Sequence, residues 1–443
     1  MVLSIIVWLR TRRCLMTVFD ALLTPVMPIL QDIEQQRRKH GNETLRWVEF
    51  VRILVFFFTE RCVSRNALVV ALENTDSALN LPHVPAMTLT DAFQRFPPTL
   101  LRQALSRFIR QIEQPIIPEL ALIGDIDAVD GSYFPVMGGV SYVRDTETPR
   151  VKLHLDLNLS RLMAVDFVIG SATSNERQAY RTMLRASVTY VLDRGYMAFA
   201  LLRDSIAAQA HVIMRACNNI VVETVEELTV DLPMQLHQHW INIRDRRVRS
   251  WHEDAQGIEF RLVEFTVGAS TYKLISDRFD LSTFQVILIY AYRWQIELAF
   301  RFFKHTMDGL HVITQSHWGI ENYFAGMFLT AVLHLQLKRD CLEMDGYTAG
   351  SATDTSPSKE TMSDDTTASA DGDHHVQPSR DTTRPSANTT VACFLARLNH
   401  PLALFWKIPK HWLATLADYL HRQFTADVVK ILNKRALANF KPT

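Results

Sequence analysis

The run YAYRWQIELAFRFFK places polar side chains at helical spacing. Its pattern, Y-x2-R-x3-E-x6-K, puts the four polar positions within roughly 60° of arc on one helix face, at about 100° per residue. These positions, with one more basic residue on the same stripe, are Tyr290, Arg293, Glu297, Arg301 and Lys304. One carboxylate among several cations suits a site that cuts a phosphodiester, because the carboxylate can hold a metal ion while the cations attract phosphate.

A purely structural interpretation of this run stands beside the catalytic one. The opposite face carries the apolar residues Ile296, Leu298, Ala299, Phe302 and Phe303, which can pack into a core. The polar face could then be a solvated surface, on which an Arg–Glu pair contributes only about 0.3–0.5 kcal/mol.

Two aspartates upstream each follow an apolar, strand-like segment. The segment IGDIDAVDGSYFP contains Asp130, followed by Gly and Ser. In SVTYVLDRGY, a β-prone run ends at Asp193, before a turn that contains Gly. Alternatives remain for both. Asp125 and Asp127 are rivals of Asp130 for the acidic role, although the following Gly and Ser favour Asp130; without that role they would lie at a solvated strand edge or in a turn. Asp193 could instead cap a helix.

With these residues in place, the chain resembles the insertion-sequence-4 (IS4) family of transposases. The family's signature is Y-x2-R-x3-E-x6-K, its first aspartate is usually followed by Gly and Ser or Thr, and DRGY is a frequent form around its second. The resemblance covers about residues 123 to 337. It implies an RNase H-like fold with a DDE catalytic triad of Asp130, Asp193 and Glu297.

The resemblance also implies a metal-dependent reaction. Three carboxylates can hold two Mg²⁺ ions about 3.5–4 Å apart, which activate the attacking oxygen and stabilise the leaving one. We therefore expect Asp130, Asp193 and Glu297 to be the metal ligands, with Mn²⁺ able to replace Mg²⁺. Without metal, the clustered carboxylates should repel one another and their pKa values should rise.

Family positions further imply a set of DNA contacts. The tyrosine and arginine of the signature contact phosphates near the transposon end and the lysine approaches the scissile region, while the tryptophan after the arginine can probe the gap left by a flipped base. The residues at DNA-contacting positions are Tyr290, Arg293, Trp294, Lys304, Arg301 and Arg215. For Trp294 and Arg215, a purely structural role is an equally open alternative. Tyr272 and Trp251 are candidate stacking partners for a flipped base.

The expected fold class is α/β, with an RNase H-like core, a β-strand insertion, an N-terminal helical region and a C-terminal helical unit. The N-terminal region, before residue 120, is assigned DNA-end binding by its position only; the alternative is a helical cap that packs on the core. Within it, we expect a helix from Leu100 to Ile112 that follows a Thr99 cap. The run RDRRVR in the insertion is either a solvated turn or a phosphate contact. The expected boundaries are residues 1–120, 121–340 with an insertion at 217–288, an acidic disordered linker at 345–390, and a basic helical unit at 393–443.

Composition sets the remaining expectations. The chain has 443 residues, 48% of them hydrophobic, with five scattered cysteines and a formal net charge of zero. Its apolar stretches are too short to span a membrane. Composition therefore agrees with an intracellular protein without membrane contact. The resemblance implies a cytoplasmic, nucleoid-associated bacterial protein that acts as a homodimer on the terminal inverted repeats and on target double-stranded DNA.

Three functional hypotheses follow. The first is an active transposase that cuts and joins DNA. The second is a catalytically silent DNA-binding derivative, such as a domesticated protein or an inhibitor of transposition. The third is an unrelated endonuclease on the same fold, which would cut but not join. The presence of Asp130, Asp193 and Glu297 favours the first.

Overall fold

The computed structural model describes residues 18–344, apart from residues 40, 42, 75–78, 113–116, 118–119, 122, 138–139, 141–148 and 233–239. The first 17 residues, the expected linker at 345–390 and the expected C-terminal unit at 393–443 lie outside the described residues.

Nine strands of the described chain form one mixed sheet. Their bounds are β1 Ile126–Pro135, β2 Arg150–Asn158, β3 Met163–Ser171, β4 Thr189–Leu192, β5 His211–Arg215, β6 Glu223–Glu227, β7 Ile241–Arg249, β8 Glu259–Val267 and β9 Ser270–Ser276. The order across the sheet is β3-β2-β1-β4-β5-β9-β8-β7-β6. β1 to β3 pair antiparallel, whereas β1, β4 and β5 pair in parallel. These five strands form the RNase H-like core that the sequence predicts.

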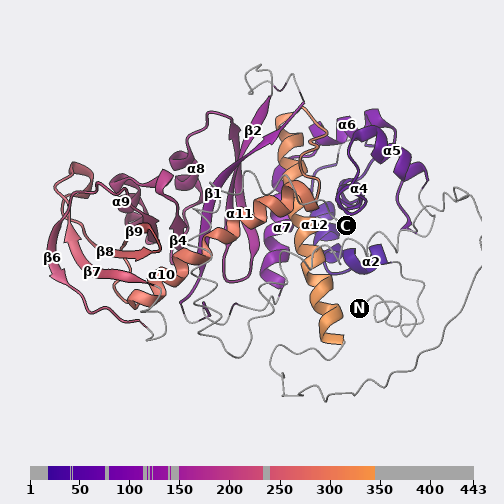
Figure 1. Cartoon of the computed structure of the whole chain (residues 1–443). Coiled ribbons are helices and arrows are strands. Elements are labelled where there is room, and N and C mark those ends of the chain that lie inside the picture. The colour runs from indigo at the N-terminus through magenta and orange to yellow at the C-terminus, as the bar shows by residue number, and fades with distance from the viewer. Residues whose placement is uncertain are drawn as a thin grey trace, which may run out of the picture.

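The segment between β5 and the signature helix extends the same sheet. β9 pairs antiparallel with β5, and β8, β7 and β6 continue outward to the edge (Figure 1). The run RDRRVR is not a turn, as one expectation had it, but part of strand β7. Its four arginines pair with glutamates of the neighbouring strands, which gives this charged segment its cross-strand partners. The pairs are Arg244–Glu227, Arg246–Glu264, Arg247–Glu226, Arg247–Glu259 and Arg249–Glu223.

Helices cover both faces of the sheet. Their bounds are α2 Val18–Leu23, α3 Met27–Gln36, α4 Trp47–Thr59, α5 Arg65–Glu73, α6 Ala86–Arg95, α7 Pro98–Gln111, α8 Glu176–Met183, α9 Phe199–Ala207, α10 Thr283–Tyr292, α11 Trp294–Arg301 and α12 His317–Met344. Helices α8 and α9 pack with one apolar cluster of the sheet, whereas α10 to α12 pack with the other. No helix among the described residues is long and apolar enough to cross a membrane.

Helix α12 joins the N-terminal helices to the sheet. It contacts α4, α6 and α7 as well as β3, and lies between the two parts in Figure 1. Gly326 permits a close approach to α4, because a Cβ there would lie 3.1 Å from Leu54 Cδ1. Residues of the N-terminal helices and of the RNase H-like core therefore belong to one continuous hydrophobic cluster.

The expected start of α7 was wrong by two residues. The helix begins at Pro98 and Thr99 does not cap it; proline suits the first helical turn, where its missing N–H leaves no bond unmade. Arg102 of this helix pairs with Asp166 and Glu321, and Arg107 pairs with Asp32. Both arginines thus make ion pairs within the protein.

Candidate active site

Strand register brings the two aspartates together. In the parallel pair of β1 and β4, Val129 lies opposite Leu192. Each chain then continues to its acidic residue, Asp130 within β1 and Asp193 immediately after β4. Strand pairing therefore makes Asp130 and Asp193 neighbours, because adjacent strands lie about 4.8 Å apart.

The third acidic residue comes from the helical layer. Glu297 lies on α11, which packs against β1. The preceding helix α10 starts at a capping box in which Ser282 and Gln285 bond each other's backbone N–H. The expected single signature helix is interrupted: Arg293 links α10 to α11, and Phe302–Thr306 forms a π-helical turn after α11.

The three carboxylates interact electrostatically. Burial raises the pKa of Asp130 to about 6; the charge of Arg293 and the Gly131 N–H oppose the rise, and the charges of Asp193 and Glu297 add to it. The Gly131 N–H donates to Asp130 Oδ1 at 2.7 Å. Mutual repulsion of this kind is what a bound cation relieves.

Arg293 is the common positive charge of the site. It is 6% exposed and its Nη2 lies 3.2 Å from Glu297 Oε1. Burial would lower the pKa of Arg293, but the charges of Tyr290, Asp193, Glu297 and Asp130 more than offset burial and raise it. The sequence pattern had suggested a solvated polar stripe as one alternative, and this is wrong at Arg293, which is buried among acidic groups.

Lys304 reaches the strand that carries Asp130. Its Nζ donates to the Ser132 hydroxyl at 2.7 Å and lies 5.0 Å from the centre of the Phe134 ring. Burial lowers the pKa of Lys304. Three residues of the sequence pattern, Arg293, Glu297 and Lys304, therefore converge on β1 and its neighbour Asp193.

The other expected DNA-contacting residues are placed differently. Tyr290 is 5% exposed, with its ring 5.8 Å from the guanidinium of Arg293. Trp294 is half-buried and Arg301 is exposed on α11. Arg215, at the end of β5, lies over the ring of Tyr272 at 4.4 Å. Of these residues, Tyr290 lies beside Arg293, the partner of Glu297, and Arg301 follows Glu297 by four residues on α11.

The two aromatic candidates for stacking a flipped base also differ. Tyr272 is 1% exposed, stacked on Phe265 at 5.3 Å and covered by Arg215. Trp251 is 74% exposed, with the Arg249 guanidinium 5.3 Å from its ring. Of the two, Trp251 alone presents its ring to solvent.

Asp127, the rival of Asp130, does not lie at the solvated strand edge or turn that its structural interpretation predicted. It is 1% exposed and accepts a hydrogen bond from Asn158 Nδ2 at 2.8 Å. Arg185 pairs with both Asp127 and Asp156. Burial fixes Asp127 in a separate ion cluster, so it is not a neighbour of Glu297 in the way that Asp130 is.

Three further residues lie beside the aspartate-bearing segments: Glu176, its partner Lys152, and Tyr196, for which the sequence pattern indicated no role of its own. Glu176 starts α8 after the Asn175 cap, and its carboxylate forms an ion pair with Lys152 Nζ at 2.6 Å. Tyr196 ends the short 3₁₀ turn Arg194–Tyr196 and is buried. Helix α9 starts after this turn, at Phe199. The DRGY string contains Tyr196, but its spacing alone does not show which way the ring points.

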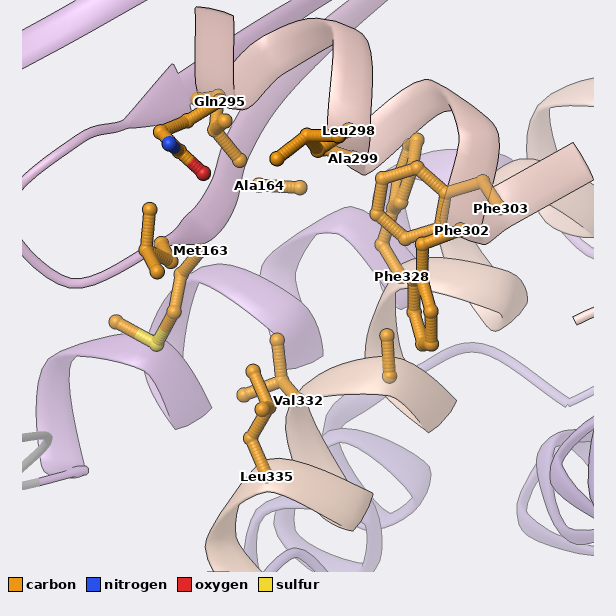
Figure 2. Close-up of a pocket in the computed structure, with 13 residues that line it drawn as sticks. Met163, Ala164, Gln295, Leu298, Ala299, Phe302, Phe303, Phe328, Val332 and Leu335 are labelled. Carbon is orange, nitrogen blue, oxygen red and sulfur yellow. The ribbon is translucent and has the colours of Figure 1, made fainter. Parts of the chain in front are cut away.

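A small apolar cavity lies beneath α11. It measures about 50 Å³ and is closed by Leu298, Ala299 and Phe302 above and by Phe328 and Val332 of α12 below (Figure 2). Helix α11, which carries Glu297, is therefore not fully close-packed against α12.

The donor chemistry of the site fits a divalent cation. Three carboxylates supply hard oxygen ligands, which Mg²⁺ prefers; burial is the main cause of the raised pKa of Asp130, and the charges of Asp193 and Glu297 add to it. Within residues 18–344 as described, no three Asp, Glu, His or Cys side chains are already gathered closely enough to hold a metal ion. In the present arrangement, Arg293 supplies the positive charge.

Comparison with known proteins adds a family match. Residues 125–333 match the family model of the transposase DDE domain, a segment that runs from just before β1 into α12 and contains all three carboxylates. No curated protein sequence matches the chain significantly.

Two solved structures show weak overall similarity. A piggyBac transposase synaptic complex with hairpin DNA is 9% identical, with a TM-score of 0.37 over 90% of this chain and 83% of that one. Endonuclease V from Bacillus subtilis is 11% identical, with a TM-score of 0.20 over 56% of this chain and 96% of that one. Residues 125–333, just under half of the chain, are therefore similar in sequence to the transposase DDE domain, and their strands have an RNase H-like order.

Proposed function

We propose that the protein is an insertion-sequence transposase of the IS4 type, which binds terminal inverted repeats and carries out cut-and-paste transposition. Asp130, Asp193 and Glu297 would be its catalytic residues and metal ligands. The observation that carries this proposal is the match of residues 125–333 to the transposase DDE domain, a segment that contains all three carboxylates, on β1, at the end of β4 and on α11.

The role of the carboxylates follows from their chemistry. Two bound Mg²⁺ ions, or Mn²⁺ in their place, would activate the attacking oxygen and stabilise the leaving oxygen. The protein's part is to hold three hard oxygen ligands on rigid elements. Asp130 is fixed by its strand and by the Gly131 N–H, and Glu297 is fixed on a helix packed against that strand.

Two cations would act on the phosphate. Lys304 lies beside Ser132, two residues along β1 from Asp130, where an ammonium group can attract the scissile phosphate. Arg293 is paired with Glu297 and buried, so we assign it the balancing of acidic charge in the DNA-free site. Tyr290, Trp294, Arg301 and Arg215 remain proposed DNA contacts.

The DNA partner and the assembly extend the proposal. Double-stranded DNA would enter along the face that carries Lys304 and the exposed Arg301, with a homodimer pairing the two transposon ends. The N-terminal helices would recognise the terminal repeat, since they share a core with the DDE domain and are thereby held at a fixed position relative to it.

The test uses the full-length protein and a linear DNA that carries its coding region with the native flanking DNA on both sides. With Mg²⁺, we expect cuts at the two element ends and joining of the released 3′ ends to target DNA, with no products in EDTA. Binding to the flanks without cutting would support the silent DNA-binding derivative instead. Cutting without joining would support the endonuclease alternative.

A further inference from the structure

Tyr196 is held rigidly next to the second aspartate. Its backbone N–H donates to the Asp193 carbonyl at 3.0 Å, which closes the 3₁₀ turn after β4. Its ring packs edge-on against Tyr180, with the ring centres 6.3 Å apart, and the residue is 1% exposed. The side chain is therefore locked by packing, and its hydroxyl is fixed in one place.

That hydroxyl is buried without a hydrogen-bond partner among the described residues. A buried hydroxyl in this state is unfavourable, because it has lost water and gained nothing in return. Its closest equivalents in the same cluster are satisfied: Tyr180 Oη lies 2.7 Å from Ser205 Oγ, and Tyr190 Oη donates to the Met183 carbonyl at 2.7 Å. The hydroxyl of Tyr196 thus lacks the hydrogen bond that both neighbouring tyrosines make, and packing does not explain why.

The surroundings of the hydroxyl are acidic. Burial raises the pKa of Tyr196 well above its ordinary value, and the charges of Asp130, Glu176 and Asp193 raise it further. The phenol therefore remains a neutral O–H donor among acidic side chains. Carboxylate oxygens are the strongest acceptors available to it.

The Glu176 carboxylate lies close to both aspartate-bearing segments. A Cβ at Gly131 would lie 3.4 Å from Glu176 Oε1, and a Cβ at Gly195 would lie 3.6 Å from Glu176 Oε2. The two glycines follow Asp130 and Asp193 closely in the chain, so one carboxylate contacts both segments. Lys152 anchors it through the 2.6 Å ion pair.

We propose, on the basis of the proposed function, that Tyr196 is a positioning residue whose hydroxyl donates a hydrogen bond to the Asp130 carboxylate, directly or through one ordered water, when the site binds divalent ions. The unpartnered hydroxyl is then a hydrogen-bond donor available to an acceptor that turns toward it. Residues that orient metal ligands in this way typically change metal affinity by about 10- to 100-fold when removed.

The experiment compares Tyr196→Phe with Tyr180→Phe in the full-length protein. Removing an unpartnered hydroxyl should leave the melting temperature of Tyr196→Phe unchanged or higher, whereas Tyr180→Phe should melt earlier because it loses the bond to Ser205. Mn²⁺ affinity, measured without DNA from the electron paramagnetic resonance signal of free Mn²⁺, should fall about 10-fold in Tyr196→Phe and stay unchanged in Tyr180→Phe.

The outcomes separate this inference from the proposed function. Unchanged Mn²⁺ affinity in Tyr196→Phe would overturn the positioning role, even if the wild type cuts DNA. Early melting of Tyr196→Phe would also overturn it, because the hydroxyl would then support the fold rather than the site. Failure of the wild-type protein to bind Mn²⁺ or cut DNA would instead overturn the proposed function on which the inference rests.

Discussion

Lys304 donates a hydrogen bond to Ser132, which ties the π-helical turn after α11 to the strand of Asp130. Hydrogen bonds in a π-helix span five residues instead of four, so the turn changes the direction in which Lys304 leaves the helix. The lysine is thereby placed beside β1 rather than simply continuing the face of Glu297.

Lys304→Ala should reduce DNA cleavage more than DNA binding. The ammonium would act on charge that develops at the scissile phosphate, and loss of one such group typically costs about 10²-fold in rate. Single-turnover cleavage and binding assays at the same ionic strength measure both effects. Ser132→Ala is the control, because it removes the tether and keeps the charge. Equal losses of rate in the two variants would contradict a direct role for the ammonium.

Asp130→Asn and Glu297→Gln should retain DNA binding and lose cleavage. Both substitutions keep the size of the side chain but remove a charged metal ligand. Gel-shift and cleavage assays on the same DNA give the two readouts, with Asp127→Asn as a matched control on the same strand but outside the proposed triad. Retained cleavage in either triad variant would remove that residue from the mechanism.

The cluster of Asp127, Asp156 and Arg185 should make stability depend on pH. Burial raises the pKa of Asp127 to about 6 and raises that of Asp156 as well. The folded protein therefore keeps a proton that the unfolded chain releases above about pH 4. The contribution of Asp127 to the free energy of unfolding is fully present below that pH and is lost as pH rises through about 6, at up to about 1.4 kcal/mol per pH unit.

Urea unfolding at several pH values between 4 and 7 tests this dependence. The difference in unfolding free energy between the wild type and Asp127→Asn should shift in favour of the variant as pH rises, since asparagine does not titrate. Parallel pH curves for the two proteins would show that Asp127 does not titrate in this window.

Asp245 should be the most sensitive charged residue of the β insertion. It accepts hydrogen bonds from Arg261 at 2.9 and 2.5 Å and from Thr283, the first residue of α10, at 2.6 Å. Asp245→Ala leaves Arg261 buried without this partner, which typically costs about 3–5 kcal/mol. Glu227→Ala breaks the exposed pair with Arg244 and should cost at most about 1 kcal/mol. Denaturant unfolding measures both, and similar costs would refute the distinction.

The core of the fold could be predicted from local pattern. The strand before Asp130, the strand before Asp193 and the helix around Glu297 each show apolar residues at the appropriate period. Strand β7 could not be predicted in this way, because its arginines are stabilised by glutamates of two other strands, β6 and β8. A charge run has no period that distinguishes a turn from such a ladder.

The site shows the same division. The types and order of Asp130, Asp193 and Glu297 were readable from the sequence, but their electrostatic contact depends on the register of β1 with β4. The burial of Arg293 and Tyr290 depends on the packing of α10 and α11, which helical periodicity alone does not give. The roles proposed for Tyr196 and Glu176 could not be predicted from the sequence either, because they depend on the side chains that surround these residues after folding.

The single hydrophobic cluster shared by α4, α12 and the sheet has a practical consequence. Severing the chain before β1 would expose the buried faces of α12 to water, so an isolated fragment starting near residue 121 should aggregate. A truncated protein for crystallisation or assay therefore has to keep the amino-terminal helices. If their removal abolished the proposed DNA cleavage, the first explanation would be loss of folding rather than loss of DNA-end recognition.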